Sequence, residues 1–232
     1  MKKYLSILMA VAILFSFAAC SNNAKSTKPE TTANTTETQQ QNTEAPVNGK
    51  TLVVYFGVPE NVDTNGVDAV AGASIVVKDG EKIGNTEYVA DVIKENTGAD
   101  LFRIEPETPY TTVHEDLVDL AKEEQNRNAR PQIKNSIENF EQYDTVFVGY
   151  PNWWGDMPQI MYTFFDTYDF SGKTIIPFST HGGSGFSNTI NTIKELEPDA
   201  EVNDDGYTVS RNDVKDAESE IIAWLGNLGY KK

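Results

Sequence analysis

The chain contains 232 residues, of which 35 are acidic and 19 are basic, so its formal net charge at pH 7 is −16. A surface of this sign repels nucleic acid and anionic lipid headgroups, which argues against a DNA- or RNA-binding function. The single cysteine excludes a disulfide within the chain and a metal site with several thiolate ligands.

The first residues have the pattern of an export signal. A short basic start precedes an apolar run over residues 4–19, which is shorter than the ~20 residues that a transmembrane helix needs. The end of this run resembles a bacterial lipobox before Cys20, although Phe17 stands where leucine is usual. The resemblance implies a signal peptide over residues 1–19 and a palmitate-bearing lipid anchor on Cys20. The alternative is ordinary secretion, with Cys20 left as a free thiol.

Residues 20–48 are rich in Ser, Thr, Asn and Gln and contain few large apolar side chains. Such a segment cannot bury enough apolar surface to order itself, so we expect a flexible tether. Residues 49–232 have the length of one compact domain with a full core. We therefore expect one folded domain that its N-terminal lipid holds at the extracytoplasmic face of a bacterial cell membrane.

The domain opens with a strand and an insertion. Residues 51–56 form a short apolar run that is typical of a buried strand. Residues 74–83 predict a β-hairpin, because strand-forming residues flank an Asp79-Gly80 turn. We expect this hairpin to be inserted after the first strand, either as a flap beside a ligand or as an addition without a function.

The next helix is predicted over residues 86–97, where apolar side chains recur at helical spacing before Gly98. The residues Gly84, Asn85 and Thr86 at its start permit two interpretations. Asn85 or Thr86 is an ordinary N-cap in the first interpretation. In the second, backbone N–H groups, the amide and the hydroxyl bind a phosphate at the positive end of the helix dipole.

Three further elements lead to the centre of the domain. Residues 100–104 predict a strand, and residues 113–128 predict an amphipathic helix that carries His114 on its exposed side, without a catalytic role. Residues 145–150 are apolar on both faces, as a central parallel strand covered by helices must be.

The loop after residue 150 reads Pro151, Asn152, Trp153, Trp154 and Gly155. Two adjacent tryptophans directly after a buried strand indicate a planar heteroaromatic ligand, on which an indole can stack. Gly155 lets the backbone approach the edge of such a ring closely. The alternative is that both indoles plug the end of the sheet.

A helix over residues 159–168 and a buried strand over residues 173–180 follow, and a second loop begins where this strand ends. This loop reads Thr180, His181, Gly182, Gly183, Ser184 and Gly185. Glycines at such a position free backbone N–H groups to face an anion or the carbonyl oxygens of a ring. The alternative is an ordinary tight connection between a strand and a helix.

Ser184 suggests a different class of function, a hydrolase with His114 or His181 as the base. The nucleophile elbow of such enzymes requires the pattern G-x-S-x-G, and Phe186 stands here in place of the last glycine. We therefore expect no catalytic residue in this loop, and we find no spacing that is typical of a metal site.

The chain closes with a helix over residues 187–196, a weak strand near residues 201–209 and a helix over residues 213–228. Strands that alternate with helices predict an α/β fold, a doubly wound three-layer sandwich around a parallel sheet. In such sheets ligands bind beyond the carboxyl ends of the strands. The loops after the first, third and fourth strands are therefore expected to converge on one site.

Five segments together resemble the flavodoxin family, and more closely a flavodoxin-like branch with a PxWWG loop. The matching segments are residues 52–56, 84–90, 150–154, 168–173 and 180–185. They occur in the same order and run from one end of the domain to the other. The resemblance implies a five-stranded parallel sheet in the order 2-1-3-4-5, and FMN as the cofactor.

The resemblance also implies the residues that bind FMN. They are Gly57, Gly84, Asn85, Thr86, Pro151, Asn152, Trp153, Trp154, Gly155, Thr180, His181, Gly182, Gly183 and Gly185. In this arrangement the residues from Gly57 to Thr86 bind the phosphate. The flavin ring lies between the loop that begins at Pro151 and the loop that begins at Thr180. The sequence departs from the family pattern where Gly57 and Ile83 replace two hydroxyl-bearing residues of the phosphate loop. Ser74 is one candidate that compensates for their loss.

These features predict an FMN-binding electron-transfer protein that is tethered to the membrane by its lipid anchor. Its partner is expected to be a redox protein or a small electron acceptor. One alternative is a reductase that passes electrons from NADH or NADPH to quinones or small oxidants. Another is a binding lipoprotein that has kept the fold and lost the flavin.

Overall fold

The computed structural model describes residues 49–59, 74–78 and 80–230. The expected signal peptide, the tether and Cys20 lie outside the described residues, as does part of the insertion after the first strand. No described helix combines the length and the apolar character that crossing a bilayer requires.

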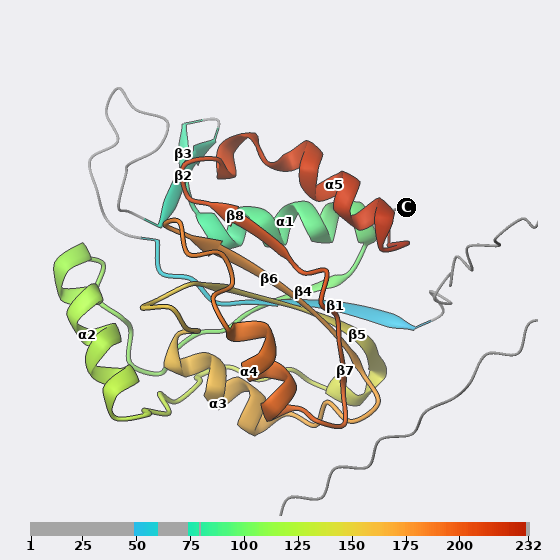
Figure 1. Ribbon diagram of the computed structural model, residues 1–232, viewed down its shortest axis with the longest axis horizontal. Coiled ribbons are helices and arrows are strands. Elements are labelled where there is room, and N and C mark those ends of the chain that lie inside the picture. The colour runs from blue at the N-terminus through green and yellow to red at the C-terminus, as the bar shows by residue number, and fades with distance from the viewer. Residues whose placement is uncertain (1–48, 60–73, 79, 231–232) are drawn as a thin grey trace, which may run out of the picture. The chain divides into compact units, whose positions relative to one another are not determined.

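A parallel sheet with five positions forms the centre of the domain (Figure 1). In spatial order its strands are β4 (Asp100–Arg103), β1 (Lys50–Tyr55), β5 (Tyr143–Pro151), β6 (Thr174–His181) and, sharing the fifth position, β7 (Glu201–Val202) and β8 (Tyr207–Ser210). Every pair in this sheet is parallel. The predicted fold class and the predicted order 2-1-3-4-5 are therefore confirmed.

The fifth strand is divided, whereas the sequence predicts one weak strand over residues 201–209. Val202 pairs with Ile175 of β6 and Tyr207 pairs with Phe178, so four residues of the fifth position lie opposite two residues of β6. The four residues are Asn-Asp-Asp-Gly, which favour turns over strands. The break leaves β8 as a separate strand beside the carboxyl-terminal half of β6.

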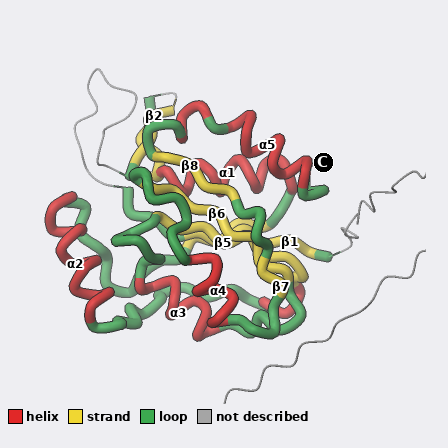
Figure 2. The backbone as a smooth tube through the Cα atoms, in the orientation of Figure 1, coloured by secondary structure: helices red, strands yellow, loops and turns green. Residues whose placement is uncertain are grey.

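Helices cover both faces of the sheet (Figures 1 and 2). One face carries α1 (Asn85–Thr97) and α5 (Glu218–Asn227), and the other carries α2 (His114–Asn126), α3 (Gln159–Thr167) and α4 (Thr189–Leu196). Successive strand residues point to opposite faces, so Leu52 and Val54 pack with the second group of helices while Val53 packs with the first. The result is the predicted three-layer sandwich.

The ends of two helices differ from the prediction. Gly84 is the N-cap of α1 and makes no side-chain cap, so the interpretation of Asn85 or Thr86 as the N-cap is wrong. Both side chains are instead buried at the carboxyl edge of the sheet. The last helix begins later than predicted, because a 3₁₀ turn, η2 (Val214–Asp216), precedes α5. Another such turn, η1 (Phe140–Gln142), leads into β5.

The predicted hairpin is present as β2 (Ile75–Lys78) and β3 (Glu81–Gly84), which pair antiparallel. Because β3 runs directly into α1, the hairpin brings Ser74 beside the start of that helix. The Asn85 backbone N–H donates to the Ser74 carbonyl oxygen at 2.9 Å. The inserted hairpin thereby forms part of the wall at the carboxyl edge of the sheet.

Candidate functional site

The loops after β1, β5 and β6 meet at the carboxyl edge of the sheet. The hydroxyl oxygens of Thr86 and Thr180 lie 2.9 Å apart and share a hydrogen bond, which joins the start of α1 to the end of β6. The Asn152 N–H donates to the Thr180 carbonyl oxygen at 2.8 Å. A Cβ on Gly57 would lie 3.7 Å from the Thr86 side chain, so the loop after β1 lies beside α1. The expected convergence of the three loops is confirmed.

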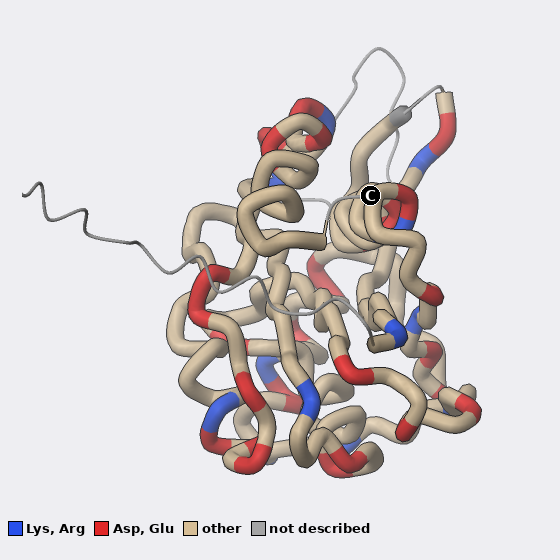
Figure 3. Tube along the Cα trace, turned by 90° about the vertical axis from the view of Figure 1, so that its right-hand side faces the viewer, with Lys and Arg blue, Asp and Glu red and all other residues tan. Residues whose placement is uncertain are grey.

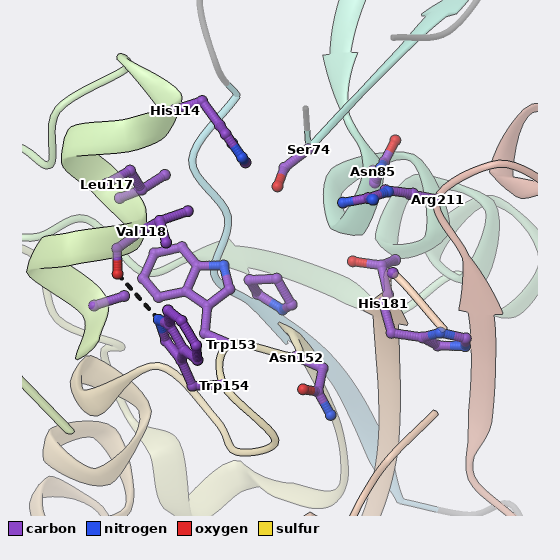
Figure 4. Close-up of a pocket in the computed structure, with 14 residues that line it drawn as sticks. Ser74, Asn85, His114, Leu117, Val118, Asn152, Trp153, Trp154, His181 and Arg211 are labelled. Carbon is purple, nitrogen blue, oxygen red and sulfur yellow. Dashed lines mark hydrogen bonds between the residues drawn. The ribbon is translucent and has the colours of Figure 1, made fainter. Parts of the chain in front are cut away.

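A pocket with about 670 Å³ of empty space, partly open to solvent, lies at this edge (Figure 4). This volume includes open solvent, and the enclosed part is about 180 Å³, which is below the range of about 300–1,000 Å³ that is usual for small-molecule sites. One wall is the apolar side of α2 with Leu117, Val118 and Ala121, and the opposite wall carries Asn85 and Arg211. The pocket thus has an apolar side and a polar side.

The structure places eight of the predicted site residues in the lining of the pocket. They are Asn85, Pro151, Asn152, Trp153, Trp154, Thr180, His181 and Gly182. The other six do not line it: Gly57, Gly84, Thr86, Gly155, Gly183 and Gly185. Ser74 lines the pocket, and so does His114, which is exposed as predicted but faces the site.

Asn152 joins the two loops that were expected to hold a ring. Its side-chain nitrogen donates to the Gly185 carbonyl oxygen at 2.9 Å and to the Ser187 hydroxyl at 3.0 Å. Its side-chain oxygen accepts the Gly155 N–H at 3.1 Å. One amide therefore fixes the spacing between the loop after β5 and the loop after β6.

The tip of the loop after β5 is a tight turn with two left-handed residues. Trp153 and Asp156 exchange backbone hydrogen bonds at 2.9 and 3.1 Å, while Trp154 and Gly155 between them have φ values of +56° and +79°. This is the pattern of a type I′ turn, which favours Asn or Gly at both central positions. A tryptophan there costs conformational energy, on the order of 1–3 kcal/mol, and such strain is found mainly at functional sites.

The two indoles have different surroundings. Trp153 is half-buried and packs edge-to-face against Phe56 and Tyr110, with ring centroids 5.7 Å apart in each case. Trp154 is 53 % exposed, and its Nε1 donates to the Val118 carbonyl oxygen at 3.0 Å. Trp153 therefore contributes to closing the end of the sheet while it borders the pocket, whereas Trp154 ties the loop to α2.

The charge of the pocket is opposite to that of the protein. Asp and Glu positions are spread along many loops and helices (Figure 3), and the net charge is −16. The described residues that line the pocket nevertheless include no carboxylate, while they include Arg211 and both histidines of the chain, His114 and His181. A pocket of this composition favours an anionic ligand.

The surroundings of His181 favour its neutral form. Burial lowers the pKa of its imidazole, and Asp213 opposes this change to a smaller extent. The ring nitrogen Nδ1 accepts the Gly183 N–H at 2.8 Å. In the neutral ring the proton is therefore on Nε2, which remains a hydrogen-bond donor.

Two buried polar atoms at the pocket have no hydrogen-bond partner among the described residues. They are the side-chain oxygen of Asn85, which is 2 % exposed, and Nε of Arg211. Buried polar atoms in native proteins are nearly always paired, so such exceptions require an explanation. A polar ligand in the pocket supplies one.

Sequence reasoning did not identify Arg211. The loop after the fifth strand also lies at the carboxyl edge, so the rule that selected the other loops applies to it as well. The weak and divided strand pattern over residues 201–209 concealed where β8 ends, and Arg211 follows directly after β8.

The structure offers no support for a hydrolase. Ser184 is exposed and does not line the pocket, and its carbonyl oxygen accepts the Ser187 N–H at 3.1 Å. Within the described ranges, no group of three or more His, Cys, Asp or Glu side chains is arranged to bind a metal ion.

Comparison with known proteins identifies the family. The flavodoxin family model matches residues 75–228. A crystal structure described as a flavoprotein from Bacteroides eggerthii is 32 % identical, with a TM-score of 0.58, and covers 78 % of this chain and 98 % of its own. One from Bacteroides uniformis is 27 % identical, with a TM-score of 0.52, and covers 72 % of this chain and 96 % of its own.

A third structure, a flavoprotein from Lactobacillus acidophilus in complex with FMN, is 18 % identical, with a TM-score of 0.50, and covers 74 % of this chain and 99 % of its own. At this identity the likeness concerns the fold alone. No curated protein matches the sequence. The family model and the Bacteroides eggerthii structure, with the strand order and the convergent loops, show that the chain belongs to the flavodoxin family.

Proposed function

We propose that this protein binds FMN in the pocket at the carboxyl edge of the sheet and transfers electrons through it. The observation that carries the proposal is the composition of the pocket, which joins an aromatic wall to a cationic polar wall without a carboxylate among the described residues, in an acidic protein. FMN has the same two parts, a flat apolar ring and an anionic phosphate. The structure of the Lactobacillus acidophilus protein with FMN has the same fold, which agrees with the proposal.

The residues of the pocket fit the flavin ring. Trp153 presents a half-buried indole, and the pocket is bounded on the same side by the apolar residues of α2. Gly182 and His181 also line the pocket and carry a backbone N–H and an Nε2–H, which are donors of the kind that the carbonyl oxygens of a ring require. Asn152 holds the two loops at a fixed distance, which gives the ring a slot of constant width.

The flavin supplies the redox chemistry, and the protein supplies binding, orientation and the local electric field. We favour an electron carrier over a reductase, because the described domain has no second dinucleotide-binding sheet for NADH or NADPH. The acidic surface favours a redox partner with a basic docking face. The protein's own role is then to bind the flavin, to shield it from water and to present it at the pocket mouth.

Titration of the flavin-free full-length protein with FMN tests the proposal. We expect one FMN per chain, with quenching of flavin fluorescence by an adjacent indole. The substitution Trp153→Leu should weaken binding, whereas Trp224→Leu, at the opposite face of the sheet against Phe147, should leave it unchanged. Absence of binding by a folded protein would contradict the proposal and favour a flavin-free binding lipoprotein.

Steady-state oxidation of NADH and NADPH by the FMN-loaded protein distinguishes the two redox functions. A carrier should oxidise either nucleotide slowly alone and rapidly when a reductase is added. Rapid oxidation by the protein alone, with a quinone as the acceptor, would overturn the carrier in favour of a reductase.

We also propose that Cys20 carries a lipid that anchors the protein at the extracytoplasmic face of the membrane. The proposal rests on the apolar run over residues 4–19 and the lipobox-like sequence before Cys20. Growth with radiolabelled palmitate should label the wild-type protein and not a Cys20→Ala variant. Equal labelling of both, or of neither, would contradict the anchor.

A further inference from the structure

Arg211 is fixed at the pocket by the strand that precedes it. Ser210, the last residue of β8, pairs with His181 at the end of β6, and the Arg211 N–H donates to the His181 carbonyl oxygen at 2.8 Å. The guanidinium lies against the backbone of Gly182, where an added Cβ would be 3.3 Å from its Cζ and Nη1 atoms. A side chain at position 182 would therefore crowd the Arg211 group.

The structure fixes the position of the Arg211 side chain but gives its Nε atom no hydrogen-bond partner among the described residues. This atom is buried. The residue as a whole is only partly buried and lines the pocket, so its guanidinium carries a charge that a ligand can reach. A charge that is partly withdrawn from water and lacks a partner lowers stability, and a bound anion offsets that cost.

Asn85 and Ser74 extend the polar wall around Arg211. Figure 4 shows the Arg211 and Asn85 side chains on the same side of the pocket, with Ser74 next to them and Trp153 on the other side. The Asn85 side chain is 2 % exposed, and its oxygen is unpartnered among the described residues. Its position at the first turn of α1 adds the positive end of the helix dipole. The acidic residue of that turn, Glu87, does not line the pocket.

We propose that Arg211 is a principal ligand of the phosphate group of FMN, with Asn85 and Ser74 at its sides. This inference rests on the proposed function and specifies how the phosphate is held. Gly57 and Ile83 lack the two hydroxyl donors that the family pattern provides in the first loop. A guanidinium can donate two parallel hydrogen bonds to a phosphate, which replaces both lost donors from a different strand.

The pair FMN and riboflavin provides a direct test, because the two flavins differ only in the phosphate. Dissociation constants for both are measured by fluorescence quenching with the full-length wild-type protein and with the variants Arg211→Gln and Arg211→Lys. Arg127→Gln is the matched control, since it removes one positive charge from an exposed arginine that pairs with Glu123.

We expect Arg211→Gln to weaken FMN binding by about 10- to 100-fold, because hydrogen bonds to charged groups are lost. Riboflavin binding should stay within about 2-fold of the wild type. Arg211→Lys should have an intermediate effect, because it keeps the charge and loses the planar fork. The affinity of the wild type for FMN should also fall more with added salt than that of Arg211→Gln.

Three results would overturn the inference. If FMN binding by Arg211→Gln is unchanged, Arg211 does not hold the phosphate although the pocket binds FMN. If both flavins are weakened equally in a variant with wild-type thermal stability, Arg211 contacts the ring. If the wild type binds neither flavin, the proposed function fails and this inference fails with it.

Discussion

Each end of the sheet holds a cationic side chain, and the two differ in burial and in their partners. At the amino end, Lys173 is 9 % exposed and donates through Nζ to the Tyr143 carbonyl oxygen at 2.6 Å. At the carboxyl end, Nε of Arg211 is buried without a partner among the described residues. The amino end is satisfied by the chain itself, whereas the carboxyl end leaves donors for a ligand. We therefore regard Lys173 as a cation that stabilises the fold and Arg211 as a cation that binds a ligand.

The surroundings of the two cations follow the same division. Next to Lys173, the Tyr143 hydroxyl donates to Asp100 at 2.8 Å, and Asp100 pairs with Lys50 at 2.6 Å. Around Arg211, the pocket lining contains no described carboxylate. The amino end thus has a carboxylate close to its cations, whereas the described lining of the pocket around Arg211 has none.

The largest effect is expected at the amino end. Lys173→Met leaves the Tyr143 carbonyl oxygen without its charged donor, so the free energy of unfolding should fall by about 2–3 kcal/mol. FMN affinity should not change. Urea unfolding measures the first quantity and flavin titration the second. Lys194→Met is the control, because Lys194 forms an exposed ion pair with Asp204, a type that contributes about 0–1 kcal/mol. Similar losses in both variants would contradict a special role for Lys173.

The next effect concerns the carboxyl end. Asn152→Ala removes the hydrogen bonds that join the two ring-binding loops, so the dissociation constant of FMN should rise about 5- to 30-fold, or about 1–2 kcal/mol. Riboflavin should be affected equally, in contrast to Arg211→Gln. An effect on FMN alone would place the phosphate near Asn152 and contradict the arrangement proposed above.

A smaller effect depends on pH. Burial, with the nearby charges of Asp169 and Asp166, raises the pKa of Glu197 to about 7. The folded protein therefore holds this proton more tightly than the unfolded chain, and stability falls as pH rises from about 4.5 to about 7. Glu197→Gln should raise the melting temperature at pH 8 and change it little at pH 4. Equal changes at both pH values would show that ionisation of Glu197 is not the cause.

The smallest effect is expected for Arg211 itself. In the flavin-free protein Arg211→Gln removes no hydrogen bond of the buried Nε, so the free energy of unfolding should stay within about 0.5 kcal/mol of the wild type or rise. Urea unfolding without flavin measures this. A loss similar to that of Lys173→Met would mean that both cations are structural and would remove the contrast between the two ends.

The sequence predicts most of the fold but only part of the site. The central strands, the start of α1 and Arg211 show why. Strands apolar on both faces, such as residues 145–150, have few alternatives in an α/β chain, so their order and direction follow. Of the two interpretations of residues 84–86, the ordinary N-cap is wrong, because the capping preferences of Asn85 and Thr86 are local. Tertiary packing instead buries both side chains at the carboxyl edge of the sheet, where Asn85 lines the pocket and Thr86 bonds to Thr180. Arg211 was missed because only the register of β8 beside β6 brings it there.

A crystal structure of the full-length protein with FMN tests the central claim most directly. The account predicts the flavin ring beside Trp153, between the loops after β5 and β6, and the phosphate within hydrogen-bond distance of the Arg211 guanidinium. A ring bound elsewhere, or a phosphate that leaves Arg211 unpaired, would contradict it.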